Sequence, residues 1–383
     1  MTAENNSNDV RPAPSGLEGV IFGPSSITFL DGHRGCMFYR GYNILDLAEK
    51  ATYEEVVHLL WEGSLPGREK LAAFTKPLVA QRALPPEVIR FLKELPKKSH
   101  PMEVLRTAVS LLSHFDPDAA DSSPEALRRK AERLTAKTST LVAAWDRIRN
   151  GKEPIAPDPS LSHAANFLYM LKGEKPSVID VQALDAYMTL LADHDLNAST
   201  FAACVVTSTL SDLHSAVTAA VGALKGPLHG GANEKAMEMF LEIGDPSKAE
   251  AYIEKALAEK KKIMGFGHRV YKVEDPRSVP LKAIARRLGE DRKELRWFEI
   301  AVKVEAAVYK RKTVKTNVDF YSAPLLYLLG IPIDLFTPLF AVARVAGWCA
   351  HVVEQLEHNR LIRPRTDYMG PTDRTFAPID QRG

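Results

Sequence analysis

The apolar residues of the chain recur mainly at the spacing of an α-helix. From Tyr42 almost to the end they fall three or four positions apart, with 56–61 as a clear example, and this period is typical of helices with one buried face. Proline or glycine interrupts the pattern and predicts helix ends at 63–66, 85–86, 96 and 226–227. Short strands are expected only in Gly19–Gly41, which is rich in glycine, β-branched and aromatic residues. The chain is therefore predicted to fold as a mainly α protein.

The most apolar stretch, Ser322–Ala343, is almost long enough to cross a bilayer. It contains Asp334, and it is divided by Pro324, Gly330 and Pro338. A charge and several helix breakers are costly in hydrocarbon. The stretch predicts two buried helices joined by a turn, and no membrane partner is expected.

Composition is that of an ordinary globular protein. The 383 residues predict two or three compact units. Because 50 Lys and Arg are balanced by 48 Asp and Glu, the chain lacks the basic excess of a dedicated nucleic-acid binder, and the charged stretch Asp116–Arg133 predicts a solvated helix and loop. Cys36, Cys204 and Cys349 are odd in number and far apart, which disfavours a disulfide framework and favours a reducing, cytoplasmic location. Residues 1–18 begin without the apolar core of a signal peptide and predict a disordered or extended tail.

Chemically distinctive residues concentrate in four short segments. The segments are Ala192–Asn197, Gly226–Glu234, Met264–Tyr271 and Asn317–Ser322. Three of them centre on His194, His229 and His268, and the fourth centres on Asp319. Glycines beside two of the histidines allow a ligand to approach the main chain closely. A structural histidine or a helix-capping aspartate has the same appearance, so no segment identifies a function by itself.

Two common kinds of site are disfavoured by these motifs. Gly265-Phe266-Gly267 lacks the third glycine and the preceding strand of a dinucleotide fingerprint. The chain also lacks the His-Glu-x-x-His spacing of many zinc sites, so no metal is expected.

Taken together and in this order, the four segments resemble the citrate synthase family. Further segments that resemble family motifs are Asp31-Gly32, Tyr39-Arg40-Gly41-Tyr42, Asp275-Pro276-Arg277 and Arg363-Pro364-Arg365. The resemblance extends from Gly19 to Pro371 and shows no departure at the positions that carry the chemistry.

The resemblance implies a multi-helical fold with short N-terminal strands. In it, residues 19–231 and 325–383 form a large helical domain, and residues 232–324 form a smaller inserted domain. Enzymes of this family condense acetyl-CoA with oxaloacetate and hydrolyse citryl-CoA to citrate and CoA, in the tricarboxylic acid cycle. The resemblance is to the Si-type acyltransferases, which need no cofactor. It also implies domain closure over oxaloacetate and a homodimer in which Arg363 completes the site of the other subunit.

The resemblance also implies a role for each central residue. Asp319 is the expected base for a methyl proton of acetyl-CoA, and desolvation by its apolar neighbours would assist that role. His229 resembles the hydrogen-bond donor to the thioester and enol oxygen. His268 resembles the residue that polarises the ketone of oxaloacetate. His194 resembles a further oxaloacetate-binding histidine, with a capped helix histidine as the alternative.

Substrate carboxylates and phosphates require cationic partners. Arg277, Arg344 and Arg363 match the carboxylate-binding arginines of the family, and a guanidinium group can pair with a carboxylate through two hydrogen bonds. Arg344 lies in an apolar run, where an uncompensated charge is expensive. The residues expected to contact CoA are Lys262, Ile263, Met264, Gly265, Phe266, Gly267, Lys312 and Lys315.

Three alternatives stay open at the level of the sequence. 2-Methylcitrate synthase, which uses propionyl-CoA, has the same catalytic set, and one extra methyl group changes discrimination by only about 1–3 kcal/mol. From another class, a metal-dependent hydrolase would use the three histidines and Asp319. A non-catalytic helical interaction protein would have no use for His229, His268 and Asp319 together.

Overall fold

The computed structural model describes residues 14–382 and consists mainly of helices. The helices are α1 (Ile44–Lys50), α2 (Tyr53–Glu62), α3 (Arg68–Ala80), α4 (Pro86–Glu94), α5 (Pro101–Leu112), α6 (Pro124–Arg149), α7 (His163–Lys172), α8 (Val178–Leu191), α9 (Ala198–Ser208), α10 (Leu213–Leu224), α11 (Ala232–Ile243), α12 (Ala249–Ala258), α13 (Ser278–Arg292), α14 (Arg296–Tyr309), α15 (Val318–Leu328) and α16 (Phe336–Glu357). The strands are β1 (Thr28–Asp31), β2 (Cys36–Tyr39) and β3 (Tyr42–Asn43). The predicted mainly α fold with short N-terminal strands is confirmed. Residues 1–13 of the predicted tail lie outside the described residues, and the remainder begins with a 3-10 turn at Ser15–Leu17.

Local signals in the sequence account for many helix ends. Thr52 and Glu55 form a capping box at the start of α2, in which each side chain accepts a hydrogen bond from the backbone N–H of the other. α2 and α7 end at Gly63 and Gly173, which both adopt the left-handed conformation that glycine tolerates. The four helix ends predicted from proline and glycine all coincide with boundaries between observed helices.

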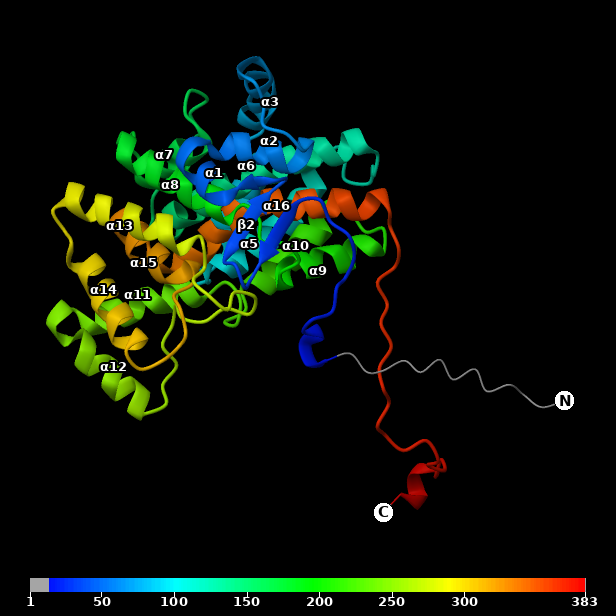
Figure 1. Ribbon diagram of the computed structural model, residues 1–383. Coiled ribbons are helices and arrows are strands. Elements are labelled where there is room, and N and C mark those ends of the chain that lie inside the picture. The colour runs from blue at the N-terminus through cyan, green and yellow to red at the C-terminus, as the bar shows by residue number, and fades with distance from the viewer. Residues whose placement is uncertain (1–13, 383) are drawn as a thin grey trace.

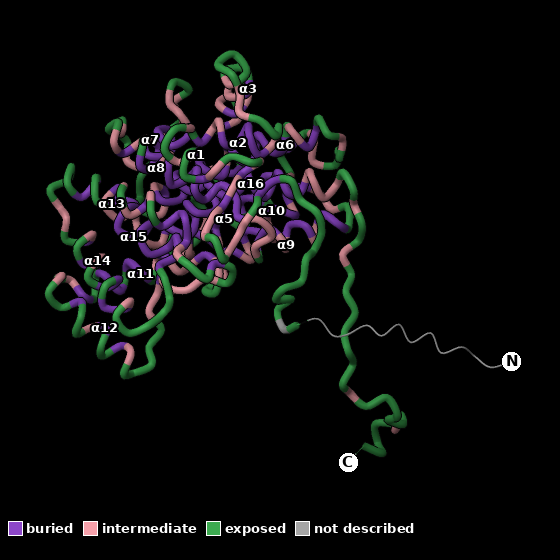
Figure 2. The backbone as a smooth tube through the Cα atoms, viewed as in Figure 1, coloured by how far each residue is buried: buried purple, intermediate pink, exposed green. Residues whose placement is uncertain are grey.

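α16 is the central helix of the larger group of helices. It packs against α2, α5, α6, α8, α9 and α10, and Figure 2 shows this region of the chain as buried. The segment Ile333–Glu357 is long and apolar enough to cross a membrane, but 94% of its most apolar window is buried inside the protein. The predicted pair of buried helices joined by a turn is therefore confirmed, with α15 and α16 separated by residues 329–335.

A second group, α11 to α15, gathers on one side of the molecule (Figure 1). Within it α12 packs on α14, and both α11 and α13 pack on α15. These helices cover most of residues 232–324, the predicted smaller domain. α13 and α15 also contact α8, so the two groups of helices meet beside the loop that follows α8.

The small antiparallel sheet supports the same loop. β1 pairs with β2 so that Thr28 lies opposite Tyr39, and β2 pairs with β3. The Tyr39 hydroxyl donates to the backbone oxygen of Asp193 at 2.9 Å, and the Thr28 hydroxyl donates to the Asp193 carboxylate at 2.5 Å. The sheet thus anchors the residue that precedes His194.

One stretch that was expected to be solvated is partly buried. Lys130 is fully buried, and Arg133 pairs with Asp116 through hydrogen bonds of 2.7 and 2.8 Å. Lys130 donates instead to the backbone oxygen of Asp121. The expectation was wrong because charge content does not reveal which charges find partners inside the fold.

Candidate active site

The loop between α8 and α9 places His194 in the interior. Asn197 caps α9 by accepting hydrogen bonds from the backbone N–H groups of its first turn, which fixes where the loop ends. The His194 ring packs against the His268 ring at 5.2 Å and the Tyr271 ring at 5.7 Å between centroids. Burial and the nearby charge of Arg277 hold the pKa of His194 well below its usual value. His194 is therefore a neutral side chain at the boundary between the two groups of helices.

The turn between α10 and α11 carries His229. At Gly230 a Cβ atom would lie 2.4 Å from the backbone oxygen of Leu224, so only glycine fits at this close approach. The Ser199 backbone N–H donates to His229 Nε2 at 3.3 Å, and the Ser199 hydroxyl lies 2.8 Å from the same nitrogen. Burial lowers the pKa of His229 to about 4. Because Nε2 accepts, the proton of the neutral ring is assigned to Nδ1, which is left free to donate.

His268 has the opposite tautomer. Its Nδ1 accepts hydrogen bonds from the backbone N–H groups of Val270 at 3.0 Å and Tyr271 at 3.1 Å. Burial, assisted by the charge of Arg277, lowers its pKa to about 4. The neutral ring therefore carries its proton on Nε2, and that N–H is available to an electronegative atom of a ligand.

Asp319 lies in the first turn of α15. Asn317 caps this helix by accepting a hydrogen bond from the Asp319 backbone N–H at 3.1 Å. Burial raises the pKa of the Asp319 carboxyl to about 7, although the charges of Arg277 and Arg344 oppose the change. A carboxylate of this basicity can take a proton at neutral pH.

Two of the three predicted carboxylate-binding arginines lie at this site. Arg277 forms a buried pair with Asp275 through hydrogen bonds of 3.0 and 2.8 Å, and Asp275 also accepts from the Val318 backbone N–H at 3.2 Å. Arg344 is buried in α16 and donates from Nε to the Leu191 backbone oxygen at 2.6 Å. Both guanidinium groups influence the pKa values of His194 and Asp319, which puts these four side chains around one region.

Arg363 does not reach this region of its own chain. It is exposed in the extended C-terminal segment that follows α16, and Figure 1 shows this segment leading away from the body of the molecule. The role of Arg363 stays a prediction.

Several buried polar atoms around the site lack hydrogen-bond partners within residues 14–382. They are Tyr187 Oη, His194 Nε2, Asn233 Nδ2, Tyr271 Oη and Arg344 Nη2. An unpaired buried polar group costs stability, and a bound polar ligand would supply partners for the unpaired atoms of His194 and Arg344. Burial raises the pKa of Tyr187, and the charge of Asp319 raises it further. The Tyr187 hydroxyl therefore lies near Asp319.

Four residues of the site were not singled out from the sequence. Ser199 and Tyr187 lie outside the four motif segments. Asn233 and Tyr271 lie within them, but no role was predicted for either. The helical spacing of apolar residues does not reveal a hydroxyl or amide group that is buried without a hydrogen-bond partner only when distant elements pack together.

The two segments predicted to contact CoA lie side by side. The Gly267 backbone N–H donates to the Lys315 oxygen at 2.8 Å, and the Asn317 backbone N–H donates to the Gly265 oxygen at 3.0 Å. Gly265 has a φ of +82°, and a Cβ there would lie 2.7 Å from the Phe320 ring. The loop is therefore tied to the start of α15, one residue from Asp319.

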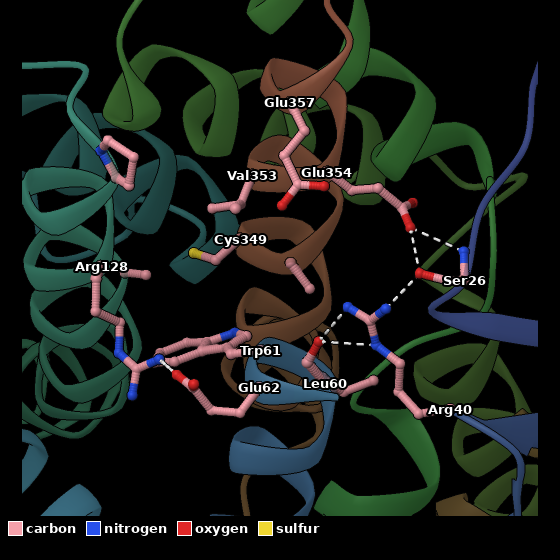
Figure 3. A pocket seen from close by; sticks show the side chains of 13 residues that line it. Ser26, Arg40, Leu60, Trp61, Glu62, Arg128, Cys349, Val353, Glu354 and Glu357 are labelled. Atoms are coloured by element: carbon pink, nitrogen blue, oxygen red, sulfur yellow. Dashed lines mark hydrogen bonds and ion pairs between the residues drawn. The ribbon is translucent and has the colours of Figure 1, made fainter. Parts of the chain in front are cut away.

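Among the residues that the structure describes, no three His, Cys, Asp or Glu side chains are grouped as metal ligands would be. A separate cavity of about 260 Å³ lies between α2, α6 and α16, lined by residues such as Trp61, Arg128 and Glu354 (Figure 3). None of the predicted site residues line it.

Comparison with known proteins identifies the family of the chain. The family model described as "Citrate synthase, C-terminal domain" matches residues 16–365. The chain belongs to the citrate synthase family. It is 50% identical to citrate synthase 2 of Bacillus subtilis over 97% of this chain and 99% of that protein. It is 48% identical to the citrate synthase of Haloferax volcanii over 96% and 98% of the two chains.

Other members of the family resemble the chain in sequence and structure. A citrate/2-methylcitrate synthase of Bacillus subtilis is 44% identical over 94% of this chain and 97% of that protein. The citrate synthase of Pyrobaculum aerophilum superposes with a TM-score of 0.89 at 42% identity, covering 96% of this chain and 95% of that chain. A citrate synthase of Thermoplasma acidophilum, solved as a ternary complex with carboxymethyl coenzyme A and oxaloacetate, superposes with a TM-score of 0.91 at 35% identity, covering 96% and 99%. The predicted family and fold are confirmed.

Proposed function

We propose that the protein condenses acetyl-CoA with oxaloacetate and hydrolyses the resulting citryl-CoA to citrate and CoA, without a cofactor. The observation that supports this proposal is a buried carboxylate of raised pKa, Asp319, which is influenced by the charges of Arg277 and Arg344, the two arginines that also act on His194. Family membership supports the same reaction and its place in the tricarboxylic acid cycle.

The first step is removal of a methyl proton from acetyl-CoA. Asp319 takes the proton, and the electron pair of the C–H bond passes to the thioester oxygen. The free Nδ1–H of His229 donates a hydrogen bond to that oxygen, and a neutral donor suits an enolate because it does not quench it by full protonation. Ser199 keeps His229 in this tautomer by occupying Nε2.

The second step joins the enolate carbon to the ketone carbon of oxaloacetate. Arg277, Arg344 and His194 would hold the two carboxylates of the substrate, which supply partners for the orphaned Nη2 and Nε2 atoms. His268 would donate from Nε2 to the ketone oxygen and then protonate the alkoxide that forms. Water then attacks the thioester carbon, the C–S bond breaks, and one proton of the water passes to the departing sulfur so that CoA leaves as a thiol. The other proton of the water is released from the new carboxyl group, and the proton taken up by Asp319 restores the neutral His268 ring through solvent.

The CoA moiety would lie along the main chain of residues 262–267, with Lys312 and Lys315 near its phosphates. The pairing of these two segments supports this placement. Lys315 stacks over the Tyr309 ring with its Nζ 4.2 Å from the ring centroid, which keeps its ammonium group beside the loop.

We further propose a homodimer with two mobile parts per subunit. Residues 232–324 would close on the remainder after oxaloacetate binds, because the site draws His268, Arg277 and Asp319 from one group of helices and His194, His229 and Arg344 from the other. Arg363 would complete the site of the partner subunit. The three scattered cysteines favour a cytoplasmic location.

The decisive test is oxaloacetate-dependent thiol release from acetyl-CoA by the purified protein. Release that needs both substrates supports the proposal, and its absence would contradict it. Release that a chelator abolishes would favour the hydrolase instead.

The second candidate function is 2-methylcitrate synthesis, because the similar Bacillus subtilis protein is named for both products. Steady-state kinetics with acetyl-CoA and propionyl-CoA will rank the two substrates. A higher kcat/KM for propionyl-CoA would replace the main proposal by this alternative.

A further inference from the structure

One face of α16 contacts the loop that carries His194 and the helix ends on either side of that loop. Arg344 donates to the Leu191 backbone oxygen at 2.6 Å, and the Gly347 backbone N–H donates to the Ala192 oxygen at 3.1 Å. Trp348 and His351 lie next along this face, since residues three or four apart share one side of a helix. Trp348 Nε1 donates to the Ser199 hydroxyl at 3.1 Å, and His351 Nε2 lies 3.0 Å from the Asp193 carboxylate.

The Asp193–His351 pair is the only one of these contacts between two titratable side chains. Asp193 is 0% exposed and His351 is 4% exposed. One oxygen of Asp193, Oδ2, also accepts from the Thr28 hydroxyl at 2.5 Å and the Asp195 backbone N–H at 3.1 Å. At Gly347, a Cβ would lie 2.5 Å from the other oxygen. The pair therefore sits at a close-packed junction of β1, α16 and the loop that carries His194.

The charges of this junction bear on Arg344. Burial would raise the pKa of Asp193, but His351, together with Arg344 and the Thr28 hydroxyl, more than offsets it, and the pKa is lowered. Burial would lower the pKa of His351, but Asp193, together with Glu354 and Asp195, more than offsets it, and the pKa is raised. The two shifts are those of a buried pair, 3.0 Å apart, in which each charge stabilises the other. Asp193 also acts on Arg344, opposing the effect of burial on its pKa, so an uncompensated Asp193 would compete with a substrate carboxylate for that guanidinium group.

We propose that Asp193 and His351 form a positioning pair for oxaloacetate: their buried salt bridge holds the His194 loop on α16 and leaves the charge of Arg344 free for a carboxylate of the substrate. The inference rests on the proposed function, since it concerns how the same site binds its keto-diacid. It gives His351 a role that requires its proton, whereas a purely structural role requires only its shape and hydrogen bond.

The test compares H351Q with the double variant D193N/H351Q. Gln keeps a side-chain hydrogen-bond donor but removes the positive charge, so H351Q leaves Asp193 uncompensated. We expect KM for oxaloacetate to rise roughly 10- to 100-fold while kcat falls less than about threefold, because a displaced binding group affects affinity before chemistry. The double variant restores neutrality with a hydrogen bond, and its KM should return to within about threefold of the wild type, a non-additive recovery that only coupled residues show.

His58→Gln is the matched control, because His58 is 1% exposed in α2 and its ring nitrogen bonds only to the Ser64 backbone oxygen at 2.8 Å. Its KM for oxaloacetate should equal that of the wild type. Wild-type KM in H351Q, or a raised KM that D193N does not correct, would overturn the inference while thiol release by the wild type continues. Loss of thiol release in the wild type itself would instead overturn the proposed function and the inference with it.

Discussion

At the scale of single residues, basicity at this site is set by burial and restrained by two cations. Asp319 gains a pKa of about 7 from burial, while Arg277 and Arg344 lower it. When both arginines pair with substrate carboxylates, their restraint weakens. Oxaloacetate would therefore make Asp319 a stronger base at the moment when a base is needed.

This argument predicts the pH dependence of the reaction. The base must be ionised, so kcat/KM for acetyl-CoA should be constant at high pH and fall as pH falls through about 7. Because bound oxaloacetate weakens the effect of the arginines on Asp319, the decline of kcat at acid pH should begin at a higher pH. Rate measurements between pH 5.5 and 9 check this.

Asp319→Asn should lose several orders of magnitude in kcat. Because a raised carboxyl pKa destabilises the folded protein as pH rises toward it, the variant should also melt higher than the wild type at pH 8. A wild-type kcat/KM that stays constant from pH 9 down to pH 5.5 would remove Asp319 as the base.

Arg344 gives a second residue-level prediction. It is buried, and within residues 14–382 its Nη2 atom has no hydrogen-bond partner. A buried charge without a carboxylate bonded to it is costly to keep out of water, and an apolar side chain removes that cost. Arg344→Leu should therefore leave the ligand-free protein at least as stable as the wild type, measured by urea unfolding, while raising KM for oxaloacetate by roughly 100-fold or more, the cost of a lost charge-assisted bond of about 3 kcal/mol. Saturating oxaloacetate should stabilise the wild type but not the variant. A large loss of stability without ligand would show that the arginine is structural.

Some residues of the candidate site could be predicted from the sequence, and others were found only in the structure. His194, His229, His268 and Asp319 were predicted because they stand in motifs that resemble a family. Ser199 and Tyr187 were not, because their significance comes from packing: one holds Nε2 of His229 and the other has a buried hydroxyl without a partner. Such relations join positions thirty or more residues apart and leave no local signal.

At the scale of elements, the loop Met264–Gly267 and helix α15 act as one unit. Gly265 and Gly267 have nearly equal φ values of +82° and +80°, but a Cβ at Gly265 would lie 2.7 Å from Phe320, while one at Gly267 would meet nothing within 4 Å. A side chain at Gly267 would therefore cause backbone strain alone, whereas a side chain at Gly265 would also clash with Phe320.

The prediction concerns Gly265→Ala and Gly267→Ala. Gly267→Ala should cost about 1 kcal/mol of unfolding free energy, the expense of an L-residue at positive φ. Gly265→Ala should cost a further 1–3 kcal/mol or so, because it displaces Phe320. It should also lower kcat, because Asp319 precedes Phe320 in α15. Urea unfolding and steady-state kinetics on both variants provide the comparison. Equal losses in the two variants would contradict the contact with α15.

Elements also show which predictions patterns can support. Helix ends followed from proline and glycine because these residues act on the nearest turn. The burial of Lys130 and Arg133 could not be foreseen, because it depends on partners such as Asp121 and Asp116 that the fold brings together. The helical spacing of apolar residues thus predicts the helices, whereas their buried ion pairs can be identified only once the fold is known.

At the scale of the whole molecule, the proposed site draws on both groups of helices. His194, His229 and Arg344 belong to the larger group, and His268, Arg277 and Asp319 belong to residues 232–324. Arg363 instead lies in a C-terminal segment that remains attached to α9 only as far as Ile362, whose N–H donates to the Ser208 hydroxyl at 3.1 Å. Exposed apolar side chains follow, including Tyr368, Met369 and Phe376, which suits a segment that packs on a second subunit.

Mixing two inactive variants tests whether the subunits share sites. In a dimer of one Asp319→Asn subunit and one Arg363→Ala subunit, the site with the intact base receives an intact arginine from its partner, and the other site lacks both. Random re-association of equal amounts should therefore recover about a quarter of wild-type activity, from parents that are each nearly inactive. Activity is measured after the mixture is unfolded and refolded together, and each variant refolded alone serves as the control. If Arg363 acted within its own chain, no mixture could regain activity, so a recovery of zero with intact dimers would contradict the shared site.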